Sequence, residues 1–193
     1  GDSIHFSVDS SKQTFLSVYD EGDVLLGTSY NSYYQNSVLT TGTYRVDVVP
    51  RYAGNVDNFT LHYVNSTTAN EHGELTSGEI ISGALTSNDL DSFTLLAVSG
   101  DSIHLSLDSS QQTYLHVYNP DGSLLGTAYN SFYANDLSQG GVYRVVVQGR
   151  YAFMVDEYDM HYVNGTTANE HGELVSGEMI SGSLTSNDLD TFI

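Results

Sequence analysis

The sequence predicts an all-β protein of two tandem, jelly-roll-like β-sandwich domains, the first of which lacks its own entry strand. Three observations support this prediction: a long internal repeat, short segments in which apolar and polar residues alternate, and turn-forming sequences between these segments. No segment shows a sustained helical period of apolar residues with caps, so helices are not expected.

The internal repeat determines the predicted domain organisation. Gly1 aligns with Gly100 without a gap, so equivalent residues are 99 positions apart, and "TTANEHGEL" occurs unchanged at 67–75 and 166–174. The order of the segments places the start of a complete unit near Ser77. We therefore divide the chain into a first repeat without entry strands at 1–75, a complete second repeat at 76–175, and the entry strands of a further repeat at 176–193.

Each predicted strand is a short segment with a two-residue period. Ile4, Phe6 and Val8 alternate with polar residues, as expected for a half-buried strand. "DEGD" at 20–23 and its counterpart "NPDG" at 119–122 are turn sequences. The further predicted strands are 14–20, 24–30, 42–50 and 58–64 in the first repeat, with entry strands at 79–87 and 91–99.

The first repeat needs something to take the place of its entry strands. A sandwich without these strands exposes apolar core and unpaired backbone groups, which costs several kcal/mol. We expect a neighbouring repeat to fill the place, either within a longer tandem array or from the tail of another molecule, which would give a head-to-tail filament. A simple truncated fragment is the remaining possibility. The expected assembly residues of the tail are the apolar Ile180, Leu184, Phe192 and Ile193.

Composition restricts the compartment and the partners. The chain has 24 acidic and 5 basic residues, a formal net charge of −19 and no cysteine. This charge repels phosphate backbones, so we expect no nucleic-acid partner, and it favours divalent cations or a salty medium. No apolar segment approaches the roughly 18 residues of a membrane span. Abundant Thr, Ser, Asn, Gly and Tyr with few lysines favour an extracellular or cell-surface location.

Several motifs together suggest a family. They are "SGALTSNDLDSFTLLAVSGDSIHLSL" at 82–107, "YLHVYNPDGSLLG" at 114–126 and "GGVYRVVV" at 140–147. This order resembles the bacterial pre-peptidase C-terminal domain, a β-sandwich similar to the collagen-binding domains of secreted collagenases. The resemblance covers 77–163, repeats over 1–64, and returns in the entry strand at 182–193. It implies an exported module with a binding or spacing role.

The acidic entry segment is the candidate cation site. It places three oxygen-bearing side chains within four residues, close to glutamates of the preceding connector at 67–75. Calcium takes about six to eight oxygen ligands. In the collagenase relatives, calcium lies where the linker meets the sandwich, and the resemblance implies the same here. The alternative is a solvated turn with a capping hydrogen bond. The candidate ligands are Glu74, Asn88, Asp89 and Asp91, with Glu173, Asn187, Asp188 and Asp190 in the copy.

No arrangement of residues in the sequence is typical of an active site. His72 lies beside Glu71 and Glu74, which allows a zinc site, with a hydrogen bond inside the connector as the alternative. There is no HExxH or G-x-S-x-G sequence and no cysteine. We therefore expect the protein not to be an enzyme.

Two further sets of residues concern the surface. An aromatic segment recurs at 28–36 and 127–135 and suits protein or glycan contacts, although core packing is the alternative. Its rings are Tyr30, Tyr33, Tyr34, Tyr129, Phe132 and Tyr133. Asparagines in N-x-[ST] sequences, the possible glycosylation sites, are Asn58, Asn65 and Asn164.

Two functions fit these features. The first is a structural subunit or part of an extracellular filament or adhesin stalk, whose tandem sandwiches join by strand completion. The alternative is a non-catalytic binding module of a secreted enzyme or adhesin that recognises collagen, glycan or a surface. A spacer stiffened by calcium is a variant of the first.

Overall fold

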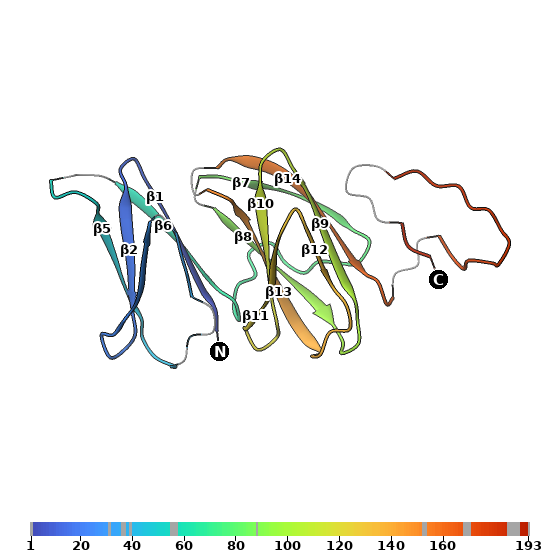
Figure 1. The fold of residues 1–193 in the computed structure, drawn as a ribbon, viewed down its shortest axis with the longest axis horizontal. Coiled ribbons are helices and arrows are strands. Elements are labelled where there is room, and N and C mark those ends of the chain that lie inside the picture. Colours follow the sequence, from blue (N-terminus) through green and yellow to red (C-terminus); the bar gives the residue numbers. More distant parts are fainter. Residues whose placement is uncertain are drawn as a thin grey trace.

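A computed structural model of the chain describes residues 2–30, 32–35, 38, 40–54, 58–87, 89–151, 154–167, 171–184 and 190–192, with residues 32–35 described by their backbone alone. These residues form fourteen β-strands and no helix, so the all-β prediction is confirmed. In the described part of the chain, no helix is long and apolar enough to cross a membrane. Two sandwiches and a C-terminal tail follow one another along the longest axis (Figure 1).

The second sandwich is a complete jelly roll of eight strands. One sheet has the order β11-β10-β13-β8 and the other β12-β9-β14-β7, and all neighbours are antiparallel. Eight strands in two four-stranded sheets agree with the jelly-roll prediction. The strands are β7 (Ile80–Leu85), β8 (Leu90–Ala97), β9 (Ile103–Ser109), β10 (Thr113–Tyr118), β11 (Leu124–Tyr129), β12 (Ser131–Ala134), β13 (Gly141–Gly149) and β14 (Asp156–Asn164).

The first sandwich has three strands in each sheet, with the orders β4-β1-β6 and β3-β2-β5. A shift of 99 positions superposes this set on β9 to β14 in the same sheet order. Among the described residues of the first sandwich, no strand takes the places that β7 and β8 hold in the second. The strands are β1 (Ile4–Ser10), β2 (Thr14–Tyr19), β3 (Leu25–Tyr30), β4 (Ser32–Gln35), β5 (Arg45–Pro50) and β6 (Phe59–Asn65).

The two sandwiches pack sheet against sheet. The sheet with β1 and β6 faces the sheet with β8, β10 and β13 (Figure 1). Val64 of β6 forms a buried apolar cluster with Leu90, Tyr118 and Val146 of the second sandwich. This shared cluster means that the junction is built from apolar packing as well as from polar contacts.

A tight turn of the second sandwich inserts into this junction. The hydroxyl groups of Ser3 and Ser66 donate hydrogen bonds to the carbonyl oxygen of Gly122, over 3.0 and 2.7 Å. Gly122 has a positive φ of 82°. A Cβ atom there would lie 2.4 Å from Thr67 Cγ2 and 3.2 Å from Asp2 Cα. Glycine is therefore required both by the backbone conformation and by the approach of the first sandwich.

We predict that Gly122→Ala loosens the junction. The methyl group would collide with the first sandwich in addition to straining the backbone, at a cost of about 1–3 kcal/mol. Gly100→Ala is the control, because Gly100 has a φ of 93° and nothing within 4 Å of an added Cβ. Limited proteolysis of the 66–77 connector should be faster for Gly122→Ala than for the control. Equal rates would show that the turn does not hold the sandwiches together.

The junction also buries two histidines. The rings of His5 and His116 meet edge to face at 5.5 Å. Burial, reinforced by the neighbouring histidines, lowers the pKa of His5 to about 3. Burial likewise lowers the pKa of His116 to about 4. Both values lie well below the ordinary histidine pKa of about 6.5, so both rings stay neutral in the folded protein.

We predict that acid weakens the fold through these rings. Below about pH 6.5 the unfolded chain takes up protons that the buried rings do not, so this stability is complete above pH 6.5 and is lost as the pH falls toward 4. The free energy of unfolding should drop by about 1 kcal/mol per pH unit more in the native chain than in His116→Gln. Denaturant titrations at pH 7 and pH 5 measure the difference. Equal losses in both chains would contradict the prediction.

Candidate assembly site

In the first sandwich, the inner face beside the places that β7 and β8 hold in the second sandwich is exposed. On β14 of the complete sandwich, Tyr158, Met160 and Tyr162 are 3, 1 and 3% exposed. The equivalent residues of β6 are Phe59, Leu61 and Tyr63, with 52, 41 and 50% exposure. Because the strands and their order are the same, the difference in burial follows from what covers them.

A pocket opens between the sheets of the first sandwich at this place. It has a volume of about 290 Å³ and is lined by apolar side chains with one glycine. Phe6 and Tyr63 stack within it, with ring centres 4.9 Å apart. The lining residues are Ile4, Phe6, Gly42, Tyr44, Val46 and Tyr63. An open apolar pocket along unpaired strands is the form of a site that accepts additional strands.

In the second sandwich, β7 and β8 occupy the equivalent space. Phe93 of β8 lies opposite Val145 of β13, and both are buried in the core. Gly83 of β7 pairs with Tyr158, whose ring is so close that a Cβ on Gly83 would lie 2.4 Å away. The entry strands therefore contribute an apolar seam to the folded unit. Its residues are Ile81, Leu85, Phe93 and Leu95.

The C-terminal tail carries the same residues in the same order, and most of them are uncovered. Ile180, Gly182, Leu184 and Phe192 correspond to Ile81, Gly83, Leu85 and Phe93. Leu184 is 70% exposed, whereas Leu85 is 1% exposed. The described residues of the tail form no strand. Ile193, the last predicted assembly residue, lies outside the described residues.

The connector before each entry strand forms a clasp with that strand. His72 Nε2 lies 3.0 Å from Asp91 Oδ1, and the His72 ring stacks on Phe93 with centres 5.1 Å apart. The tail repeats this arrangement, since His171 Nε2 lies 2.9 Å from Asp190 Oδ1 and its ring stacks on Phe192 at 5.0 Å. The contact of His72 is therefore with the entry strand β8 and not inside the connector. In the tail, the described residues that form the clasp belong to no β-strand.

The predicted calcium ligands take part in hydrogen bonds of the fold. Asp89 accepts hydrogen bonds from the backbone and the hydroxyl group of Thr86, and thereby caps a turn. Asp91 is buried, and its Oδ2 accepts a hydrogen bond of 2.6 Å from Tyr158. Asn88, Asn187 and Asp188 lie outside the described residues.

The described residues contain one group of three potential metal ligands, Glu71, His72 and Asp91. Glu74, by contrast, pairs with Thr94 of β8 through a backbone bridge. Glu173 of the tail is exposed. Among the described residues, the predicted calcium ligands therefore do not form one set, and a cation here stays a prediction.

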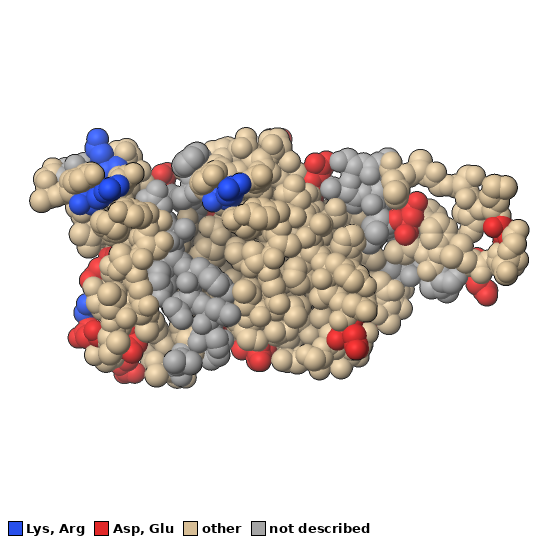
Figure 2. Space-filling model, viewed as in Figure 1, with Lys and Arg blue, Asp and Glu red and all other residues tan. Residues whose placement is uncertain are grey.

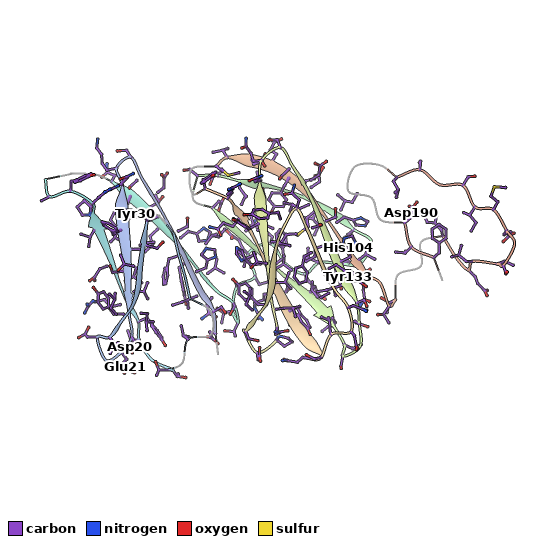
Figure 3. The ribbon with its side chains drawn as sticks, viewed as in Figure 1. Asp20, Glu21, Tyr30, His104, Tyr133 and Asp190 are labelled. Atoms are coloured by element: carbon purple, nitrogen blue, oxygen red, sulfur yellow. The ribbon has the colours of Figure 1, made fainter. Side chains whose placement is uncertain are left out.

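The aromatic residues do not form one patch. Tyr30 and Tyr129 are exposed on β3 and β11, where they stack on Phe15 and Tyr114. Phe132 is buried in the core, so its assignment to a contact surface is wrong. Tyr133 is exposed on β12, in the other sheet, beside His104 (Figure 3). Nothing is described for the side chains of Tyr33 and Tyr34.

Two of the three glycosylation candidates use their side chains inside the fold. Asn164 is buried, and its Nδ2 donates a hydrogen bond of 2.8 Å to Asp101. Asn65 Nδ2 donates to Asp2, while its Oδ1 accepts hydrogen bonds from Thr67. A glycan on either nitrogen would replace one N–H donor and would need space beside these contacts. Asn58 is exposed.

Tyr158 is a further partner of Asp91 that the sequence patterns did not indicate. Burial, together with the hydrogen bond to Asp91, raises the pKa of Tyr158, so its hydroxyl group stays protonated and donates. The first repeat has Phe59 at this position. The difference between the repeats was visible in the sequence, but its meaning depends on contacts between strands that are far apart along the chain.

We predict that Tyr158→Phe destabilises the second sandwich by about 1–3 kcal/mol, because a buried carboxylate would lose a hydrogen-bond donor. Tyr133→Phe is the control, since this ring is exposed and should change stability by less than about 0.5 kcal/mol. Denaturant unfolding monitored by tyrosine fluorescence measures both. If the two variants unfold at the same concentration, the hydrogen bond to Asp91 is not stabilising.

The basic residues do not form an extended surface. On the face shown in Figure 2, lysine and arginine lie at separate places, and acidic side chains are scattered over both sandwiches and the tail. On that face, the assembly site is therefore not bordered by a continuous row of charges of one sign.

Comparisons with known proteins give little further information. No family model matches the sequence, and no curated protein matches it, so the resemblance to pre-peptidase C-terminal domains stays a prediction. Among solved structures, the chain is similar to Aeromonas hydrophila PliG, a periplasmic lysozyme inhibitor of g-type lysozyme. The identity is 15%, the match covers 46% of this chain and 93% of that chain, and the TM-score is 0.39.

Proposed function

We propose that the protein is a structural module of an extracellular assembly of tandem β-sandwiches, joined by strand completion between neighbours. The observation that carries the proposal is the open inner face of the first sandwich, at the place that β7 and β8 fill in the second. The proposed occupant is the 176–193 segment of a second copy, whose residues correspond to β7 and to the first five residues of β8. Each copy then completes the next one, head to tail.

The repeat determines the expected register of the donated strands. Phe93 lies opposite Val145, so Phe192 should lie opposite Val46. In the other sheet, Tyr158 lies opposite Gly83, so Phe59 should lie opposite Gly182. Backbone hydrogen bonds supply affinity, and the alternating side chains fix the register.

A non-catalytic role and an exported location are part of the proposal. Abundant Thr, Ser, Asn, Gly and Tyr with few lysines, the strongly acidic composition and the resemblance to pre-peptidase C-terminal domains support it. Calcium between connector and entry strand would stiffen the assembly, and chelation would then lower its melting temperature.

We predict that Leu184→Asp abolishes assembly. The side chain is exposed in the single chain but would enter the core of the neighbour, where an unpaired carboxylate costs several kcal/mol. The association constant should therefore fall by about 100-fold or more. Met179→Asp is the matched control, because its equivalent Ile80 is 56% exposed in the complete sandwich. Light scattering and negative-stain microscopy measure the size of the assemblies.

The outcomes separate the candidate functions. Assembly of the native chain and of Met179→Asp, but not of Leu184→Asp, supports strand completion between copies. A native chain that stays monomeric, but whose first sandwich is stabilised by a free peptide of residues 171–193, would indicate that the neighbours are joined covalently in a longer array. No assembly and no stabilisation by the peptide would contradict strand completion and favour the binding module.

A further inference from the structure

The two sandwiches present equivalent outer faces. The second sandwich covers the face of β1 and β6, and on the face of β9 and β14 the side chains of His161 and Val163 are also buried within the single chain, with 4 and 1% exposure. The outer face of β1 and β6 carries Ser3, His5 and Val64, which contact the second sandwich. The equivalent residues on β9 and β14 are Ser102, His104 and Val163. This second face points away from the first sandwich, toward the side on which the tail lies (Figures 1 and 3).

The matching surface lies at the opposite end of the molecule, on the first sandwich. The turn at 20–24 has the same backbone hydrogen bonds as the turn at 119–123 that inserts into the junction. Asp23 has a φ of 59°, close to the 82° of its equivalent Gly122. Leu25, equivalent to the partly buried Leu124, is half exposed. The first sandwich thus displays, uncovered, the elements that the second sandwich uses for docking.

The residues at the two places differ in a compensating way. Gly122 leaves no room for a side chain, whereas Asp23 carries one. On the opposite face, Ser66 is replaced by Gly165, so the larger turn residue would meet a smaller partner. The larger side-chain volume of Asp23 is thus matched by the smaller volume of Gly165, as close packing requires.

The threonine that follows this position, Thr67 in the first repeat and Thr166 in the second, also makes different hydrogen bonds in the two repeats. Thr67 Oγ1 donates to Asn65, and Thr67 Cγ2 is the atom that excludes a Cβ at Gly122. Thr166 Oγ1 instead accepts a hydrogen bond from the backbone nitrogen of Ser102. In the first sandwich, the equivalent donor is the backbone nitrogen of Ser3, and Ser66 Oγ accepts its hydrogen bond. The Thr166 hydroxyl group is therefore turned toward Ser102.

We propose that the outer face of β9 and β14 is an interface, and that its partner is the 20–25 turn with the outer face of β2 and β5 of a second copy. The second copy docks there as the second sandwich docks on the first. This inference rests on the proposed function, because the tail that completes the second copy also brings the two surfaces together. The buried Val146 is replaced by Asp47, which pairs with Arg45. The interface between copies is therefore more polar than the junction within one chain, as in non-obligate contacts.

The absence of cysteine from the chain allows a direct test by disulfide formation between two variants. One copy carries Gly165→Cys and the other Asp23→Cys. At the existing junction, an added Cβ at Gly122 would lie 3.1 Å from Ser66 Oγ, so the equivalent pair is within reach of a disulfide bond. An added Cβ at Gly165 meets nothing closer than 3.7 Å, so the substitution fits. The mixed disulfide should form about tenfold faster than in the control mixture of Gly165→Cys with Gly54→Cys.

The position of Gly54 makes it a suitable control, because it is exposed on the same sandwich and has nothing within 4 Å of an added Cβ. Adding Leu184→Asp to the Gly165→Cys chain should remove the rate difference. If assembly depends on Leu184 but the 23–165 disulfide forms no faster than the control, the interface is wrong and strand completion stands. If assembly does not depend on Leu184 and the 23–165 disulfide is no faster, both proposals fail. A fast 23–165 disulfide that does not depend on Leu184 would support the interface and reject strand completion.

Discussion

The packing of two entry strands against sheets formed later in the chain is the interaction on which the second sandwich depends. In the second sandwich, β7 and β8 place Leu85, Phe93 and Leu95 in the core. Tyr162 is buried beside these strands, whereas its equivalent Tyr63 is half exposed in the first sandwich, whose described residues include no counterpart of β7 and β8. The same sequence pattern therefore gives a closed core in one unit and an open one in the other.

The entry strand β8 also connects neighbouring units. Phe93 points into the core of its own sandwich, while Leu90 belongs to the apolar cluster shared with Val64 of the first sandwich. One strand thus completes a core and builds a junction. Because the same eight residues of β8 complete the core and contact the adjacent sandwich, insertion of this strand and docking of that sandwich stabilise each other.

A polar clasp holds the entry strand to its connector. His72 and Asp91 form it in the second sandwich, and His171 and Asp190 repeat it in the tail. In the proposed assembly, a tail that already contains this contact would have less conformational freedom to lose when it binds. The first repeat has Phe59 at the position of Tyr158, so Asp190 would there lack the hydrogen-bond donor that Tyr158 supplies to Asp91.

The sequence by itself determined the fold class, the repeat, seven of the eight strand segments of a complete unit and the correspondence of the tail with the entry segment, because these follow from local periodicity and from self-alignment. It did not indicate the short strands β4 and β12. Only the tertiary structure decided that Phe132 is a core residue, that Asp91 binds His72 and Tyr158, and which faces of the sandwiches meet. These contacts join residues distant in the chain, and a two-residue period identifies two faces of a strand without showing which neighbour covers each.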